Sequence, residues 1–271
     1  MFFDEIVLAI ETKLSPKIYR IASEYSGLYY GEVNGKKHIK KILFTVDLSL
    51  ESIHYAIKNK INLIISLNGF NNNPITHFNQ LLINKLSLLS RYPLLIFVLN
   101  SAFISAEGGV SDTLMESLYL KLDQTLNVKN KGGNSVPIGR ICVPNSFTDK
   151  NKIMTLNDLI KRIKSNLEVD EVLFVGELNS EVKNICIVGE DKTNINYLQK
   201  ALKKKCDCYI SGYFDHQIAS YAKESRLNLI GISLYNCNTI ALKKLHNVLS
   251  LEFPRDDFYF FESKDPIKMF N

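Results

Sequence analysis

The sequence predicts an α/β protein with mainly parallel or mixed central sheets, and two observations lead to this prediction. Short apolar runs rich in β-branched residues recur along the chain, and stretches with apolar residues at helical spacing separate them. Regular alternation of this kind is typical of βαβ units, whose strands lie parallel in one sheet. With 271 residues, the chain is long enough for about two domains.

The first half alternates strands with helices. The expected strands cover residues 42–46, 63–67 and 94–99. The expected helices cover residues 50–58, 76–90 and 110–121. The stretch 127–137, with two adjacent glycines and a closing proline, has the composition of a loop and marks the expected boundary. We therefore place a first α/β lobe at residues 1–130 and a second at 131–271.

The second half resumes the same alternation. The expected strands cover residues 138–143, 172–175, 184–188, 208–211 and 227–232, with an edge strand at 258–262. The expected helices cover residues 156–167, 195–203, 215–224 and 239–249. Thr155 is expected to cap the first of these helices, because Asp158 follows three residues later.

Composition and charge narrow the class of protein. The formal net charge is +5, but the densest basic stretches, 36–41 and 203–205, flank expected buried strands, so we expect no specific nucleic-acid binding. Five cysteines and an acidic opening predict reduced thiols and a cytoplasmic protein. The longest apolar runs are too short to span a bilayer, so no membrane association is expected.

Several common catalytic signatures are absent from the sequence. There is no Walker loop, no Gly-x-Gly-x-x-Gly turn after a strand and no Gly-x-Ser-x-Gly elbow. After Gly189, the acidic pair Glu190 and Asp191 would repel a phosphate. Cys206 and Cys208 lack the spacing of a zinc site, and we expect them in the core.

His216 and Asp215 are the weak catalytic candidates that the residues themselves offer. They follow Ser211 and Gly212, where a strand turns into a helix, and ligands of α/β sheets bind at that edge. An adjacent imidazole and carboxylate can act as a general acid–base pair. The other histidines lie inside expected helices or basic stretches, where surface exposure or packing accounts for them.

Seven short segments occur in the order and spacing of a known family pattern. Residues 108–112 read Gly-Gly-Val-Ser-Asp, residues 139–141 read Gly-Arg-Ile, and residues 206–212 read Cys-Asp-Cys-Tyr-Ile-Ser-Gly. The other four cover residues 26–31, 42–47, 63–66 and 233–238. On these segments the chain resembles the Nif-three-like family, also known as GTP cyclohydrolase I type 2 homologues.

The resemblance implies two α/β lobes that face each other across a cleft, and a homo-oligomer with a toroidal hexamer as first guess. Intact members would bind two divalent metal ions on a His-His pair, an aspartate, and a later His and Glu. The corresponding positions here are Leu67, Asn68, Ile104, Leu234 and Asn238. Aliphatic side chains carry no lone pair and a neutral amide is a poor ligand for such metals. The resemblance therefore implies a degenerate metal site, and no cofactor is expected.

The leading hypothesis is a divergent family member that acts as an oligomeric binding or scaffold protein. Its cleft, which the resemblance lines with Leu67, Asn68, Asn100, Ser101, Leu234 and Asn238, would bind a small polar ligand or a protein partner. The alternative is a metal-free hydrolase acting on a nucleotide-like or pterin-like substrate through His216 and Asp215. A third possibility is a subunit that pairs with a metal-competent paralogue. Whether the chain is an enzyme stays open at this point.

Overall fold

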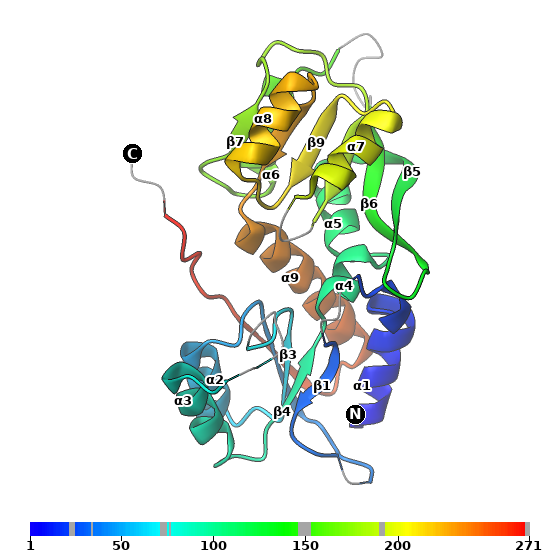
Figure 1. The fold of residues 1–271 in the computed structure, drawn as a ribbon. Coiled ribbons are helices and arrows are strands. Elements are labelled where there is room, and N and C mark those ends of the chain that lie inside the picture. Colours follow the sequence, from blue (N-terminus) through cyan, green and yellow to red (C-terminus); the bar gives the residue numbers. More distant parts are fainter. Residues whose placement is uncertain are drawn as a thin grey trace.

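The computed structural model describes residues 1–21, 25–33, 35–70, 75, 77–145, 153–189 and 193–268. It consists of two α/β lobes, each built on one mixed sheet, with a long helix running between them (Figure 1). The predicted fold class is confirmed. Within the described residues, no helix is both long enough and apolar enough to cross a membrane.

The first lobe holds a five-stranded sheet in the order β1-β4-β3-β2-β11. Its strands are β1 (Gly27–Tyr30), β2 (Lys41–Thr45), β3 (Leu63–Ser66), β4 (Leu95–Val98) and β11 (Asp257–Phe261). The last four run parallel, and β1 pairs with β4 in the antiparallel sense. The central strands β3 and β4 are buried at every position, since both faces of the sheet are covered.

Helices cover the two faces of this sheet. On one face, α2 (Leu50–Lys58) and α3 (Gln80–Leu89) contribute to a core with Leu43, Ile64 and Ile96. The other face packs against α1 (Phe3–Ala9), which continues into a π-helical turn (Ile10–Leu14) and, after Ser15 and Pro16, a 3₁₀ turn (Lys17–Tyr19).

The second lobe holds a six-stranded sheet in the order β5-β6-β8-β9-β10-β7. Its strands are β5 (Leu120–Lys129), β6 (Ser135–Pro144), β7 (Leu173–Val175), β8 (Ile185–Val188), β9 (Cys208–Ser211) and β10 (Asn228–Gly231). The three strands β8, β9 and β10 run parallel, and the other pairings are antiparallel.

Three helices belong to this second sheet. One core, formed with α7 (Ile195–Lys203) and α8 (His216–Glu224), lies on one face, and α6 (Leu156–Asn166) packs on the other. Thr155 caps α6 as predicted: its hydroxyl accepts from the Asp158 backbone N–H, and the Asp158 carboxylate accepts from the Thr155 N–H.

Several expected boundaries differ from the structure. The helix expected over 110–121 ends at Ser117, since Tyr119 adopts a positive φ of 50° that a helix cannot continue through. The helix expected over 76–90 begins at Gln80, because the Asn79 side chain caps it by accepting from Leu82 N–H. Residue 76 lies outside the described residues, as do Glu190 and Asp191.

Strand pairing groups the chain differently from the expected lobes at both ends. The loop expected as a boundary at 127–137 spans the tip of the hairpin between β5 and β6, so both strands belong to the second sheet. The edge strand expected at 258–262 is β11, and it pairs with β2 of the first sheet. The chain therefore starts in the first lobe, builds the second, and returns to the first.

The return path is α9 (Leu234–Glu252), which leaves β10 and leads to β11. Its 19 residues make a rod about 28 Å long between the lobes, seen in Figure 1. Its buried residues Cys237, Ala241 and Leu245 belong to one core that also takes in residues from both sheets. The two lobes thus share one hydrophobic core, in addition to the separate core that each lobe forms on the other face of its sheet.

A buried ion pair between α5 (Val110–Ser117) and β6 also holds the two lobes in place relative to each other. Asp112, in the first turn of α5, is 7% exposed, and Arg140 on β6 is 3% exposed. The guanidinium donates to both carboxylate oxygens, and one of these oxygens also accepts from the Gly108 N–H at 2.8 Å. Arg140 further donates to four backbone carbonyls, those of Ser105 (3.3 Å), Ala106 (3.1 Å), Pro137 (2.7 Å) and Gly139 (3.3 Å). Ser105 is the last residue of α4 (Ser101–Ser105), so one side chain ties α4, α5 and β6 together.

The neighbouring residues allow close contact between α5 and the second sheet. The Ser111 hydroxyl donates to the Ile138 carbonyl at 3.0 Å and accepts from the Gly189 N–H at 3.1 Å. A Cβ atom on Gly189 would lie 2.5 Å from a methyl carbon of Val110. Only glycine permits this approach.

We expect Asp112→Asn to lower the free energy of unfolding by about 3–5 kcal/mol, because it leaves the Arg140 charge buried without a partner. The double variant with Arg140→Met should recover part of this loss, since both buried charges are then gone. Urea denaturation followed by circular dichroism measures the effect. As a control, Glu116→Gln removes an ion pair between α5 and Lys244 of α9 that is largely exposed, and should cost about 1 kcal/mol or less. Equal effects for Asp112→Asn and Glu116→Gln would contradict a special stabilising role of the buried pair.

Candidate ligand-binding pocket

A cavity of about 940 Å³ lies between the two lobes. Its walls come from segments that follow parallel strands: residues 46–47 after β2, Asn68 beyond β3, residues 212–213 after β9 and residues 232–233 after β10. The carboxyl ends of parallel strands are the usual ligand-binding edge of such sheets. Here two such edges, one from each sheet, open onto one space. The first turn of α9, the loop before β7 and residues 265–268 complete the walls.

The structure brings three of the five resemblance-derived positions to this pocket. Asn68, Leu234 and Asn238 line it, the last two one helical turn apart on α9. Leu67 and Ile104 are buried in the core shared by the lobes and are not among the lining residues. Asn100 and Ser101, also expected in the cleft, are not lining residues either. The Asn100 amide donates to the Tyr25 carbonyl at 3.2 Å, and the Ser101 hydroxyl accepts from the Ile21 N–H at 3.3 Å.

The donor set of the pocket does not fit a dinuclear metal centre. Leu234 offers no donor atom, and the Asn68 amide nitrogen points at a carboxylate oxygen of Asp47, to which it donates at 2.9 Å. Across the part of the chain that is described, His, Cys, Asp and Glu form no group of three or more that could hold a metal ion.

Asn238 is the polar residue in the pocket wall whose environment is hardest to account for. It is only 2% exposed, and its Oδ1 has no hydrogen-bond partner among the described residues. An unpaired buried acceptor costs free energy, and native proteins seldom retain one without a reason.

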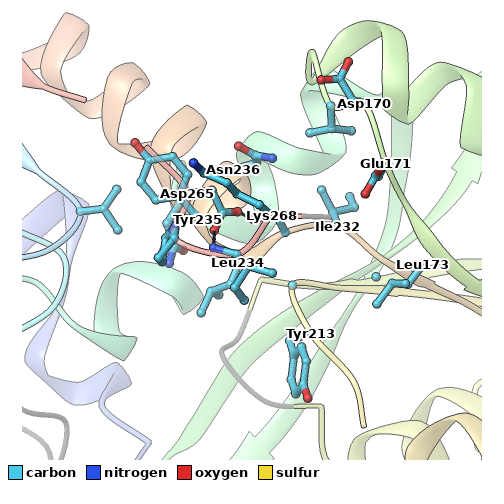
Figure 2. A pocket seen from close by; sticks show the side chains of 18 of the residues that line it. Asp170, Glu171, Leu173, Tyr213, Ile232, Leu234, Tyr235, Asn236, Asp265 and Lys268 are labelled. Carbon is cyan, nitrogen blue, oxygen red and sulfur yellow. Dashed lines mark hydrogen bonds between the residues drawn. The ribbon is translucent and has the colours of Figure 1, made fainter. Parts of the chain in front are cut away.

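Carboxylates dominate the charged groups of the lining. Among the described lining residues, Asp47, Asp170, Glu171 and Asp265 are opposed by one ammonium group, that of Lys268. Figure 2 shows Asp170 and Glu171 on the side of the pocket away from Tyr235, while Asp265 and Lys268 lie beside the first turn of α9. Burial lowers the pKa of Lys85 in the first lobe, and the nearby Asp47 carboxylate partly offsets this shift.

The segment after β11 crosses to the start of α9, and its residues 265–268 form one wall of the pocket. The Ser233 hydroxyl donates to the Asp265 carboxylate, and the Tyr235 hydroxyl donates to the Ser263 carbonyl. Asp265 also accepts from the Ile267 N–H at 2.9 Å. Ser233 is the N-cap residue of α9 but makes no capping hydrogen bond to the helix. Its hydroxyl instead holds this segment in place.

The catalytic candidates predicted from sequence lie elsewhere. Asp215 is the N-cap of α8 and accepts from the Ile218 N–H at 3.0 Å, so its carboxylate has a structural role. His216 is the exposed first residue of α8, and neither residue is among the lining residues, although Gly212 and Tyr213 just before them are. The thiol nearest to Asn238 in sequence, that of Cys237, is also unsuited to catalysis, because burial raises its pKa to about 12.

The sequence analysis did not identify most of the charged residues that line the pocket. Asp170 and Glu171 were not singled out, and residues 265–268 fall after the last expected strand. A weak signal existed only for Gly212 and Tyr213, which follow an expected parallel strand at the edge where ligands bind.

Comparison with known proteins gives consistent matches along the chain. The family model described as Duf34/NIF3 (NGG1p interacting factor 3) matches residues 1–266. A GTP cyclohydrolase 1 type 2 homolog of Clostridium perfringens is 26% identical, with 99% of each chain covered. Another from Methanocaldococcus jannaschii is 26% identical over 91% of this chain and 93% of its own. The crystal structure of a Bacillus cereus protein related to NIF3 has a TM-score of 0.83 at 16% identity and covers 100% of this chain and 99% of its own. A hypothetical protein of Staphylococcus aureus has a TM-score of 0.81 at 20% identity, with the same coverage.

We expect Asn238→Leu to raise the free energy of unfolding by about 1 kcal/mol or more, because it removes a buried acceptor that lacks a partner in the free protein. Chemical denaturation of the two proteins measures the difference. The matched control is Asn228→Leu. The Asn228 amide is also buried, but it accepts from the Ser180 hydroxyl and donates to the Asp207 carbonyl, so its loss should destabilise. Destabilisation of similar size by both variants would show that Asn238 has a partner in solution.

Proposed function

The chain belongs to the Duf34/NIF3 family, and we propose that it is a divergent member that binds a ligand in the pocket between its lobes without the two metal ions implied for intact members. In this proposal it acts as an oligomeric binding or scaffold protein in the cytoplasm. The observation that carries the proposal is the pocket itself. It is large, and three positions that would carry metal ligands line it with Asn68, Leu234 and Asn238 instead.

The physical argument for metal-free binding rests on what these side chains can do. Leucine contributes apolar surface, and asparagine contributes one acceptor and two donors. Neither stabilises a divalent cation as imidazole and carboxylate do. A pocket with these groups suits an organic ligand held by hydrogen bonds and apolar contact, which is the usual composition of small-molecule sites.

The alternative is a hydrolase, in line with the name GTP cyclohydrolase 1 type 2 homolog of the relatives at 26% identity. The residues favour binding over this alternative. The candidate pair would have to be Asp215 and His216, but Asp215 caps α8 and neither residue lines the pocket. Fold similarity to the family does not supply a reaction by itself.

Self-association is supported by the edges of the second sheet. Both β5 and β7 are edge strands, and their outer sides offer unpaired backbone groups. On β7, the side chain of Phe174 is 44% exposed, whereas the 43% exposed Leu173 lines the pocket. We keep the toroidal hexamer as the first assembly to test.

The metal part of the proposal predicts less than about 0.1 equivalents of zinc, manganese or iron in protein purified without a histidine tag, since no suitable ligand set lines the pocket. Inductively coupled plasma mass spectrometry measures this. The triple variant Asn68→His, Leu234→His, Asn238→Glu is the matched positive case. If the three positions converge, it should bind about one zinc ion per chain, with water completing the coordination. Stoichiometric metal in the unmodified protein, lost in Asn68→Ala with Asn238→Leu, would refute the proposal.

The assembly part predicts a solution mass that is a multiple of the 30.9 kDa chain mass. Multi-angle light scattering across micromolar concentrations measures it, and a hexamer would have about six times the chain mass. The variant Phe174→Glu places a charge on the β7 edge and tests whether that edge takes part. A uniform 30.9 kDa particle at every concentration would contradict an oligomeric scaffold.

A further inference from the structure

One wall of the pocket is a segment of chain that belongs to no helix or strand. It follows β11 of the first lobe and runs past the start of α9 towards the second lobe (Figure 1). Its residues 265–268 line the pocket together with the loop that leads to β7 in the second lobe. Figure 2 shows Asp265 and Lys268 beside Tyr235 and Asn236 of α9. The segment therefore lies across the space between the lobes.

This segment separates the pocket from solvent with a single layer of chain. Pro266, Ile267 and Lys268 all line the pocket, and all are exposed. By contrast, β10, which ends at the lining residue Gly231, is buried at every position. A wall with solvent on its outer side and few buried contacts can move without opening a hydrophobic core.

Few hydrogen bonds hold the segment in place. Among the described residues, the backbone of 263–268 makes no backbone–backbone hydrogen bond, whereas β11 just before it pairs with β2 along its whole length. The segment is joined to α9 by the Ser233 hydroxyl, which donates to Asp265, and by the Tyr235 hydroxyl, which donates to the Ser263 carbonyl. Two such bonds favour the closed position by roughly 10- to 100-fold. An open form is then populated at about 1–10%.

The segment is built to move as one piece. The Asp265 carboxylate accepts from the Ile267 N–H at 2.9 Å and so closes a turn around Pro266, whose ring restricts its own φ. Phe261, the last residue of β11, is paired with β2 and stays with the sheet. The pivot of such a movement therefore lies directly after β11, at residues 262–263.

Ile267 links closure to an occupied pocket. Its apolar side chain lines the pocket and yet is 72% exposed in the free protein. The nearby walls include the apolar residues Val169, Ile232 and Leu234. An apolar group bound between them and Ile267 removes part of this surface from water, which favours the closed position.

We propose that residues 263–268 form a lid on the pocket. The Ser233 and Tyr235 hydroxyls latch it closed, it opens about the residues after β11 to admit a ligand, and it closes over the bound ligand. This inference rests on the binding role proposed above and adds to it the control of access to that site.

The test measures how fast full-length protein takes up an uncharged dye, N-phenyl-1-naphthylamine, by stopped-flow fluorescence. The variant Ser233→Ala with Tyr235→Phe removes both latch hydroxyls. It should bind the dye about tenfold faster or more, because the open form is then no longer a minor one. The control Ser90→Ala with Tyr25→Phe removes two hydroxyls that also donate to backbone carbonyls, at sites that do not line the pocket, and should leave the rate unchanged.

A second variant separates the latch from direct contact with the dye, since Ser233 and Tyr235 line the pocket themselves. Ser233→Cys with Asp265→Cys places two thiols where the native side chains touch, and the native cysteines are all buried. The disulfide formed with oxidised glutathione locks the lid and should slow dye uptake about tenfold or more. Reduction with dithiothreitol should restore fast uptake in the same protein, and mass spectrometry follows the bond.

A further pair of variants shows that the dye enters this pocket. Leu173 and Leu178 are 43% and 42% exposed, but only Leu173 is a lining residue. Leu173→Glu should therefore weaken dye binding at equilibrium about tenfold, because it places a charge against the apolar dye. Leu178→Glu makes the same change outside the pocket and should leave the affinity unchanged.

The opposite outcomes are distinguishable. Equal uptake rates in the unmodified, latch-free and locked proteins, with an affinity that Leu173→Glu lowers, would refute the lid and leave the binding role standing. Dye binding that Leu173→Glu leaves unchanged would place the dye outside the pocket and refute a lid that controls its entry. If even the latch-free protein takes up no dye, the lid and the binding role fail together.

Discussion

The buried pair of Asp112 and Arg140 is the constraint on which the arrangement of the two lobes depends. The Arg140 guanidinium donates to the Asp112 carboxylate on α5 and to backbone carbonyls at the end of α4 and in β6. A shift of these helices relative to β6 would therefore leave a buried charge without its partner. The pocket takes its walls from both lobes, with Asp47 and Asn68 on one side and Tyr213 and Ile232 on the other. A fixed junction is therefore what gives the pocket a definite shape.

The sequence predicted best those strands that are buried on both faces. β8 is an uninterrupted apolar run and β3 has three apolar residues before Ser66, which is how a central parallel strand looks in sequence. The long edge strand β5 was missed because the helix expected over 110–121 covers its first residues and its burial alternates only over its last four positions. Its pairing with β6 depends on the hairpin that joins the two strands. Likewise, nothing local shows that β11 would pair with β2, more than 200 residues earlier in the chain.

The residues of the pocket, like the strands, were predicted only in part. The resemblance led to Asn68, Leu234 and Asn238, all of which line the pocket, but not to Leu67 or Ile104, which are in the core. Of these two neighbours only Asn68 lines the pocket, because Leu67 packs into the core that the lobes share. The charged wall could not be predicted at all, since Asp170 and Asp265 come from a loop and a terminal segment that only tertiary packing brings together.

The route of the chain also bears on the order in which the molecule is made. A ribosome releases residues in sequence, and domains generally fold as units while synthesis proceeds. Every strand of the second sheet is translated before α9 is complete, whereas the first sheet lacks its β11 edge until residue 261 has emerged. The wall contributed by residues 265–268 emerges later still. A nascent chain therefore holds a nearly finished scaffold around an open cleft, and the pocket acquires its final wall only when translation has passed every other lining residue.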